Sequence, residues 1–243
     1  MNPKARASAP APGLPAQPLD LPWVAPPLHE QVYAAILEAI CGGALRSGER
    51  IHQDELAARL GVSRQPVTQA LTVLRTQDFV QDNGRRGLVV APLRRKFFES
   101  LYQLRESLDP MAARLAARQH RTLVPAEAHA LLERGRQALE QGELGALTRA
   151  DMDFHMWIYA ASGNPLLAET LRLYWHHLRR SMVAVVGPAH DRHRVWEEHE
   201  AIVQAILAGD EAAAERLSLR HIRDAALRVL QSLPETGFGP DAD

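Results

Sequence analysis

The chain has 243 residues, 46% of them hydrophobic, and a formal net charge of -1 at pH 7, which allows one or two domains with buried cores. The near-neutral charge excludes a protein that binds nucleic acid through a basic surface spread over the whole molecule. The single cysteine excludes an internal disulfide, and without an apolar run of ~18 residues or a signal peptide's hydrophobic region we expect a cytoplasmic protein with no membrane partner.

The first 27 residues hold eight of the 16 prolines. Proline fixes φ and lacks an amide hydrogen, so this composition predicts a disordered leader over 1–27. Apolar residues at helical spacing follow from Leu28 in LHEQVYAAILEAICGGAL, and the glycine pair 42–43 predicts the end of this first helix.

The segment 53–76, QDELAARLGVSRQPVTQALTVLRT, has the pattern of two helices joined by a tight turn at Gly61. Ser63 is expected to cap the second helix, with Arg64 and Gln65 in its first turn. This layout is typical of a helix-turn-helix that places its second helix in the DNA major groove, although an ordinary pair of packed helices has the same pattern.

Two short β-prone segments follow, Phe79-Val80 and 88–90, and Asn83-Gly84 between them favours a hairpin turn. A hairpin here would be the wing of a winged helix-turn-helix domain spanning 28–94. Arginines in this domain would meet phosphates. The candidate DNA-binding residues are Ser63, Arg64, Gln65, Thr68, Arg75, Gly84, Arg85 and Arg86.

Beyond residue 94 the sequence shows helical periodicity interrupted by glycine and proline, with no convincing strand. The expected helices lie near 95–120, 125–141, 145–163, 165–186, 191–208 and 210–232. The fold class is therefore mainly α, with a winged helix-turn-helix domain followed by an all-α antiparallel bundle over 95–233 and a flexible tail over 234–243.

Four polar residues are predicted to point into this bundle. Asp151 and His155 are four residues apart and share a helix face with apolar neighbours, while His199 and His221 lie on the apolar stripes of the last two helices. Imidazole and carboxylate are ligands of Zn²⁺, Ni²⁺ or Mn²⁺, and Zn²⁺ is the first choice. Spacing alone leaves a hydrogen-bonded polar core open as the alternative.

Four other histidines do not fit such a site. His176 and His177 are adjacent on a helix and cannot share a face, and His190 and His193 lie near Pro188 in a predicted loop. We expect none of them to bind the ion.

The motifs together resemble a known family of bacterial regulators. The segment 29–93, with GVSRQPVTQAL and a glycine-flanked wing, resembles the winged-helix domain of the GntR family. The motifs LRESLDPMAARLAA, DMDFHMWIYAASGNPLL, EEHEAIVQAILAGD and AAERLSLRHI resemble the FCD ligand domain of the FadR subfamily. Together these similarities cover nearly everything except the two tails.

This resemblance implies a homodimeric transcription factor that reads a palindromic operator in double-stranded DNA. It further implies that Asp151, His155, His199 and His221 are the ligands of the metal-containing branch, and that a small carboxylic acid reaches the ion as effector. Arg105 matches a family arginine and is our candidate for effector binding, the alternative being a solvated helix arginine paired with Asp109 or Glu106.

Thr68 stands where the family usually has an arginine that contacts the operator, which predicts a changed operator sequence. We expect a repressor, although the sequence leaves an activator open. Two further interpretations stay open at this stage: a metal-dependent hydrolase or lyase, and a DNA-binding regulator whose metal is purely structural. No nucleophile elbow, phosphate-binding glycine loop or HExxH motif supports an enzyme.

Overall fold

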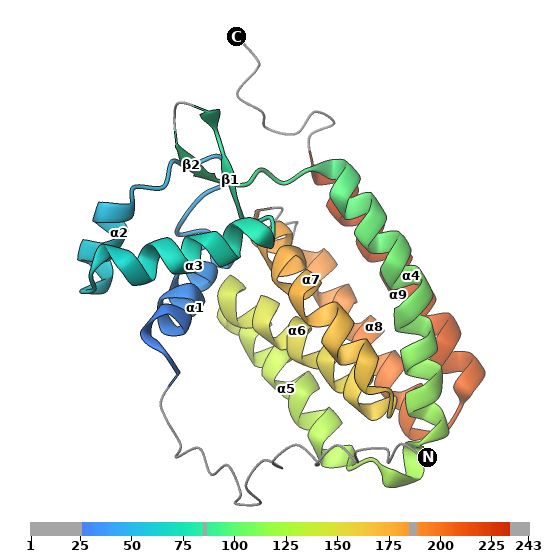
Figure 1. Ribbon diagram of the computed structural model, residues 1–243. Coiled ribbons are helices and arrows are strands. Elements are labelled where there is room, and N and C mark those ends of the chain that lie inside the picture. Colours follow the sequence, from blue (N-terminus) through green and yellow to red (C-terminus); the bar gives the residue numbers. More distant parts are fainter. Residues whose placement is uncertain (1–25, 85–86, 185–188, 234–243) are drawn as a thin grey trace, which may run out of the picture.

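The computed structural model describes residues 26–84, 87–184 and 189–233. Residues 1–25 of the predicted leader, the tail, and Arg85 and Arg86 of the wing lie outside these residues. A small N-terminal domain sits at one end of a bundle of long helices (Figure 1). Its elements are α1 (Leu28–Cys41), α2 (Gln53–Leu60), α3 (Arg64–Thr76), β1 (Val80–Asp82) and β2 (Leu88–Val90). Those of the bundle are α4 (Arg95–Arg118), the 3₁₀ turn η2 (His120–Thr122), α5 (Pro125–Gln141), α6 (Leu144–Ala161), α7 (Pro165–Ala184), α8 (Ala189–Leu207) and α9 (Glu211–Ser232).

The helix-turn-helix has the predicted form. Gly61 ends α2 with φ of 65°, a left-handed conformation that a residue without a Cβ adopts at little cost. The apolar stripes of α2 and α3 are buried against α1 and the hairpin, at Leu56, Ala57, Val67, Ala70, Leu71 and Leu74. Burial of these side chains fixes the angle between α2 and α3 and leaves the polar face of α3 in solvent.

The wing is a two-stranded antiparallel hairpin in which Val80 pairs with Val90 and Asp82 with Leu88. The first strand begins at Val80, one residue later than predicted. Phe79 is fully buried in the domain core, and its carbonyl accepts a hydrogen bond from the amide of Ala91 at 2.9 Å. Arg50, before α2, forms an isolated bridge to Val89 that the sequence pattern did not predict.

The mainly α prediction is confirmed, and the helix boundaries differ from those expected by one or two residues. At the start of α8 the difference is two residues, since the helix begins at Ala189 and not at 191. The first bundle helix ends at Arg118 because the chain tightens into η2. Helix α6 ends at Ala161, before Gly163 takes a φ of 71°. Among the described residues no helix has the length and apolar character needed to cross a membrane.

Helices α4 and α9 run side by side along the bundle (Figure 1), and the core between the helices is apolar. Its largest fully buried side chains include Trp175, Phe154 and Tyr159. These rings pack beside the polar residues of the site described below, so charged and titratable groups lie next to an apolar core.

Helix α7 joins the two domains. The ring of His177 stacks on Phe79 with centroids 4.0 Å apart, and its Nε2–H donates to the carbonyl of Gln77 at 3.0 Å. Arg179 forms a bidentate ion pair with the carboxylate of Glu38 in α1. The N-terminal domain is therefore docked on the bundle through side chains of α7.

Candidate functional site

Three histidine rings meet inside the bundle. His155 lies on α6, His199 on α8 and His221 on α9, and each is at most 3% exposed. Nε2 of His221 lies 3.4 Å from Nε2 of His155 and 3.3 Å from Nε2 of His199. Oδ1 of Asp151, one turn before His155 on α6, is 3.5 Å from Nε2 of His199. The structure therefore brings all four predicted metal-binding side chains together.

A carboxylate orients the ring of His221 through the ring nitrogen that faces away from the other histidines. Nδ1 of His221 lies 2.9 Å from Oε2 of Glu198 on α8. A carboxylate accepts hydrogen bonds, so Nδ1 carries the hydrogen and the lone pair of Nε2 faces the other histidines. Such a carboxylate behind the ring is the usual partner of a metal-binding histidine. The sequence analysis did not select Glu198, although it immediately precedes His199.

Arg105 lies beside the cluster and is only 2% exposed. Its Nη2 donates to Oδ2 of Asp109 at 2.8 Å and is 3.4 Å from both ring nitrogens of His155. The guanidinium also stacks over Trp175, 4.5 Å from the ring centre. The alternative of a solvated helix arginine is therefore wrong, because the pair with Asp109 forms in the protein interior.

Burial sets the charge states of the cluster. It lowers the pKa of His155 and His199 well below the ordinary range, and the positive charge of Arg105 lowers both further. Burial raises the pKa of Asp151 to about 6, while His221 and Arg105 favour its ionised form. Neutral imidazoles have free lone pairs at neutral pH, which is the state that metal binding requires.

The donor set fits a divalent ion. In tetrahedral coordination with zinc-nitrogen distances of about 2.0–2.1 Å, ligand atoms lie about 3.3 Å apart. The three separations given above are 3.3, 3.4 and 3.5 Å. Oδ2 of Asp151 is buried and has no hydrogen-bond partner among the described residues. A hydrogen-bonded polar core would pair such an oxygen, so the geometry favours a ligand over a core residue.

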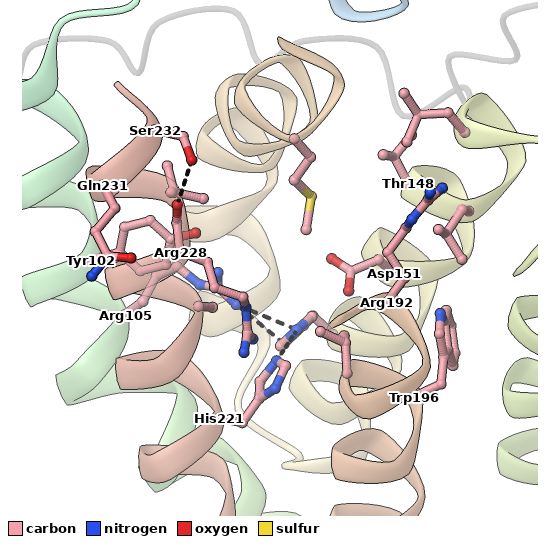
Figure 2. A pocket seen from close by; sticks show the side chains of 17 residues that line it. Tyr102, Arg105, Thr148, Asp151, Arg192, Trp196, His221, Arg228, Gln231 and Ser232 are labelled. Carbon is pink, nitrogen blue, oxygen red and sulfur yellow. Dashed lines mark hydrogen bonds between the residues drawn. The ribbon is translucent and has the colours of Figure 1, made fainter. Parts of the chain in front are cut away.

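A cavity of about 350 Å³ opens directly over this cluster. Asp151, His155 and His221 of the cluster line it, together with Arg105. Figure 2 shows Tyr102, Arg105 and Arg228 on one wall and Thr148, Arg192 and Trp196 on the other, with Asp151 between them. The remaining wall is largely apolar. The volume is at the lower end of the range for small-molecule sites.

Helical spacing could have revealed two cavity residues that the sequence analysis missed. Arg192 precedes His199 by seven residues on α8, and Arg228 follows His221 by seven residues on α9. A separation of seven residues is two helical turns, so each arginine shares a face with a histidine. Tyr102 and Trp196 also line the cavity, but their spacing predicts only a core position.

The excluded histidines whose side chains the structure describes lie away from the cluster. His177 is buried at the contact between the domains, where it stacks on Phe79, and His193 is exposed. The loop predicted for His190 and His193 is wrong, since both belong to α8. The side chain of His190 lies outside the described part of the chain. His176 has a carbonyl that accepts from Sγ of Cys41 at 3.4 Å, so it too contributes to the domain contact.

The DNA-reading face predicted for α3 is exposed. Arg64, Gln65 and Thr68 project into solvent from its N-terminal half. The hydroxyl of Thr68 donates to Oε1 of Gln53 at 3.1 Å, and Arg64 lies 3.5 Å from Asp54. These contacts are long or weak, so the side chains are free to rearrange against a base or a phosphate.

Ser63 occupies the N-cap position of α3, but its side chain makes no capping hydrogen bond, so that prediction is wrong. The residue is exposed, and water can satisfy the first amides of the helix. In the wing, Gly84 is exposed with φ of 51°. Arg75 contacts Oδ2 of Asp82 at 3.2 Å, with half of its side chain exposed. Whether these residues bind DNA stays a prediction.

Comparison with known proteins agrees with both domains. Residues 28–90 match the family described as "Bacterial regulatory proteins, gntR family", and residues 100–224 match the family described as "FCD domain". The Nta operon transcriptional regulator of Aminobacter aminovorans is 33% identical over 136 residues, which are 55% of this chain and 63% of that protein. The probable D-xylose utilization operon transcriptional repressor of Paenarthrobacter nicotinovorans is 28% identical over 195 residues, 79% of this chain and 84% of that one.

Among solved structures, a GntR transcriptional regulator from Rhodococcus sp. RHA1 superimposes with a TM-score of 0.76. The superposition covers 85% of this chain and 99% of that chain at 21% sequence identity, so it shows the shared fold alone. Both families consist of transcriptional regulators and not enzymes, which removes the hydrolase or lyase interpretation. The chain therefore belongs to the GntR family of bacterial transcriptional regulators, with a winged helix-turn-helix domain followed by an FCD domain.

Proposed function

We propose that the protein is a repressor whose affinity for its operator is controlled by a small carboxylic acid. The acid binds beside a divalent ion that Asp151, His155, His199 and His221 hold. Zn²⁺ is our first choice for this ion. The observation that carries the proposal is that this buried donor set lies beside a 350 Å³ cavity, which Asp151, His155 and His221 line. An ion that served structure alone would need no cavity above it.

The residues around the ion suit a carboxylate ligand. Three histidines and one aspartate supply the four ligands of a tetrahedral zinc ion, so the acid would add as a fifth ligand from the cavity, an expansion that zinc accepts. Ni²⁺ or Mn²⁺ would accept one or two oxygens of the acid in the same place. Arg105 lies 3.4 Å from the ring of His155, so one carboxylate can reach the ion and the guanidinium together. When bound, the ion would supply positive charge and a further coordination position, while Arg105 would orient the acid.

DNA would be bound by a homodimer, with one α3 helix of each subunit in a half-site of a palindromic operator. Repression is supported by the relative from Paenarthrobacter nicotinovorans, which is named a probable repressor. For the acid to release DNA, it must bind the DNA-free arrangement more tightly than the DNA-bound one. A 100-fold change in operator affinity corresponds to about 2.7 kcal/mol of coupling.

Helices α6 and α7 provide the path for that coupling. Thr148 of α6 and Met182 of α7 line the cavity. The nearby Arg149 and Arg179 of the same two helices both approach Glu38 of α1, at 3.7 Å for Arg149. An acid that shifts either helix would therefore move the contacts that hold the DNA-binding domain.

Metal analysis of matched histidine variants tests the site. We expect about one zinc per chain in the purified protein and in His193→Ala, whose histidine is exposed and outside the cluster, and almost none in His199→Ala. A panel of small carboxylic acids should raise the melting temperature of the metal-loaded protein and should have no effect after chelation. Equal metal content in both variants would contradict the proposed ligands.

The effect on DNA is measured separately, by fluorescence anisotropy with an operator selected from random duplexes. An acid that stabilises the metal-loaded protein should lower operator affinity. If chelation unfolds the protein and no acid binds before chelation, the ion is purely structural. If the acid strengthens operator binding, the protein is regulated in the opposite direction.

A further inference from the structure

We infer that the effector carries a second anionic group, which binds Arg192 and Arg228 while the first lies at the ion and Arg105. This inference rests on the proposed function and specifies the chemical class of the ligand as a dicarboxylate. It depends on two observations: where the arginines lie and how their charges are balanced.

The positions follow from helix geometry. Helices α8 and α9 pack against each other and are joined by the short turn 208–210, so they run in opposite directions. Arg192 lies seven residues before His199 on one helix, and Arg228 lies seven residues after His221 on the other. Seven residues span about 10 Å along a helix axis. Both arginines therefore lie at the same end of the cavity, two turns from the histidines.

Both side chains line the cavity, with Arg228 and Arg192 on opposite walls (Figure 2). Nε of Arg192 is buried and has no hydrogen-bond partner among the described residues. Arg228 contacts Oε2 of Glu198 only at 3.6 Å, and Glu198 is already bonded to His221 at 2.9 Å. Among the described residues, neither guanidinium has a close carboxylate of its own, unlike Arg105 with Asp109.

The charge balance points to the same ligand. Among the described residues, three arginines line the cavity and three carboxylates lie at or directly behind its wall: Asp109, Asp151 and Glu198. With these groups alone, a divalent cation would leave two uncompensated positive charges at the cavity. A monocarboxylate neutralises one of them and a dicarboxylate neutralises both, so the dianion avoids burying an unpaired charge.

Matched acids test this inference on the full-length, zinc-loaded protein. Succinate and butyrate have the same number of carbons and differ in the second carboxylate, as do glutarate and valerate. We expect the dicarboxylate of at least one pair to bind about tenfold more tightly than its monocarboxylate, as measured by isothermal titration calorimetry, because charge-assisted hydrogen bonds contribute this much.

Variants locate the second group. Arg192→Gln and Arg228→Gln should each reduce this preference to less than about threefold. The control is Arg220→Gln on α9, because the side chain of Arg220 is 76% exposed and does not line the cavity. Arg192→Lys, which keeps the charge, should retain most of the preference and guards against a folding defect in Arg192→Gln.

The outcomes distinguish this inference from the proposed function. If both acids of each pair bind equally tightly, the effector site exists but the second anionic subsite does not. If the preference survives in both glutamine variants, the arginines are not its source. If neither class of acid binds the zinc-loaded protein, the proposed function itself fails.

Discussion

Two arginine-aspartate ion pairs have similar N–O distances, but one is buried and the other is exposed to solvent. Arg105 and Asp109 are 2.8 Å apart and each is 2% exposed, in the bundle beside the histidines. Arg75 and Asp82 are 3.2 Å apart at the wing, with side chains 50% and 67% exposed. The chemistry is the same, so the difference between the two pairs isolates the effect of burial.

The folded protein needs the buried pair to stay intact, whereas it can lose the exposed pair at little cost in stability. A charge removed from water needs its partner, whereas a solvated charge exchanges its partner for water at little cost. The buried pair can therefore hold Arg105 in one position for a ligand. The exposed pair can open when a phosphate approaches, which suits a surface that must bind and release DNA.

The largest expected effect is from Asp109→Asn. This change keeps the shape of the side chain but leaves the buried guanidinium of Arg105 without a counter-charge, and we expect the free energy of unfolding to fall by about 3–5 kcal/mol. Urea unfolding followed by tryptophan fluorescence would measure it, since Trp157, Trp175 and Trp196 all lie in the bundle. A loss under about 1 kcal/mol would show that burial does not separate the two pairs as argued.

The next largest effect is a loss of stability at low pH, caused by His177 at the contact between the domains. The pKa of His177 is lowered from 6.5 to about 4, mainly by burial of the ring. The charges of Arg180 and His176 also lower this pKa, whereas the hydrogen bond to Gln77 and the charge of Asp78 raise it. The folded protein thus holds His177 neutral, and below pH 6.5 the unfolded chain takes up a proton that the folded chain does not. The stability of the domain contact is full above pH 6.5 and falls by up to about 3 kcal/mol between pH 6.5 and 4.

The matched variant is His177→Gln, which keeps a hydrogen-bond donor and does not titrate. Its free energy of unfolding should vary less between pH 7 and pH 4.5 than that of the unmodified protein. The difference between the two proteins isolates His177 from the other buried histidines. Identical pH profiles for the two proteins would rule out this contribution.

The smallest effect is expected from Asp82→Asn. Because the pair is solvated, the free energy of unfolding should change by less than about 1 kcal/mol. Affinity for a short mixed-sequence duplex at low salt should rise a few-fold, since Arg75 becomes free for a phosphate and a negative charge leaves the surface. Weaker DNA binding would mean that Asp82 positions Arg75 instead of competing for it.

The sequence predicted the parts of the fold that depend on periodicity. The stripes of α2 and α3, the stop at Gly61 and the helices of the bundle follow from the spacing of apolar residues and the conformations of glycine. The same reasoning selected all four side chains of the cluster, because polar residues on apolar stripes must point into the core. It was wrong about the Ser63 cap, since a hydroxyl in solvent can bond water instead of the helix.

By itself, therefore, the sequence determined the two domains, their order along the chain and the inward direction of the histidines, all properties of single helices and their nearest neighbours. Only the tertiary structure decided that Arg192 and Arg228 come from different helices to the same end of one cavity, and that α7 holds the DNA-binding domain through His177 and Arg179. Such contacts depend on how helices far apart in the chain are rotated and packed against one another. Helical spacing shows which face a side chain occupies, but not which partner that face will meet.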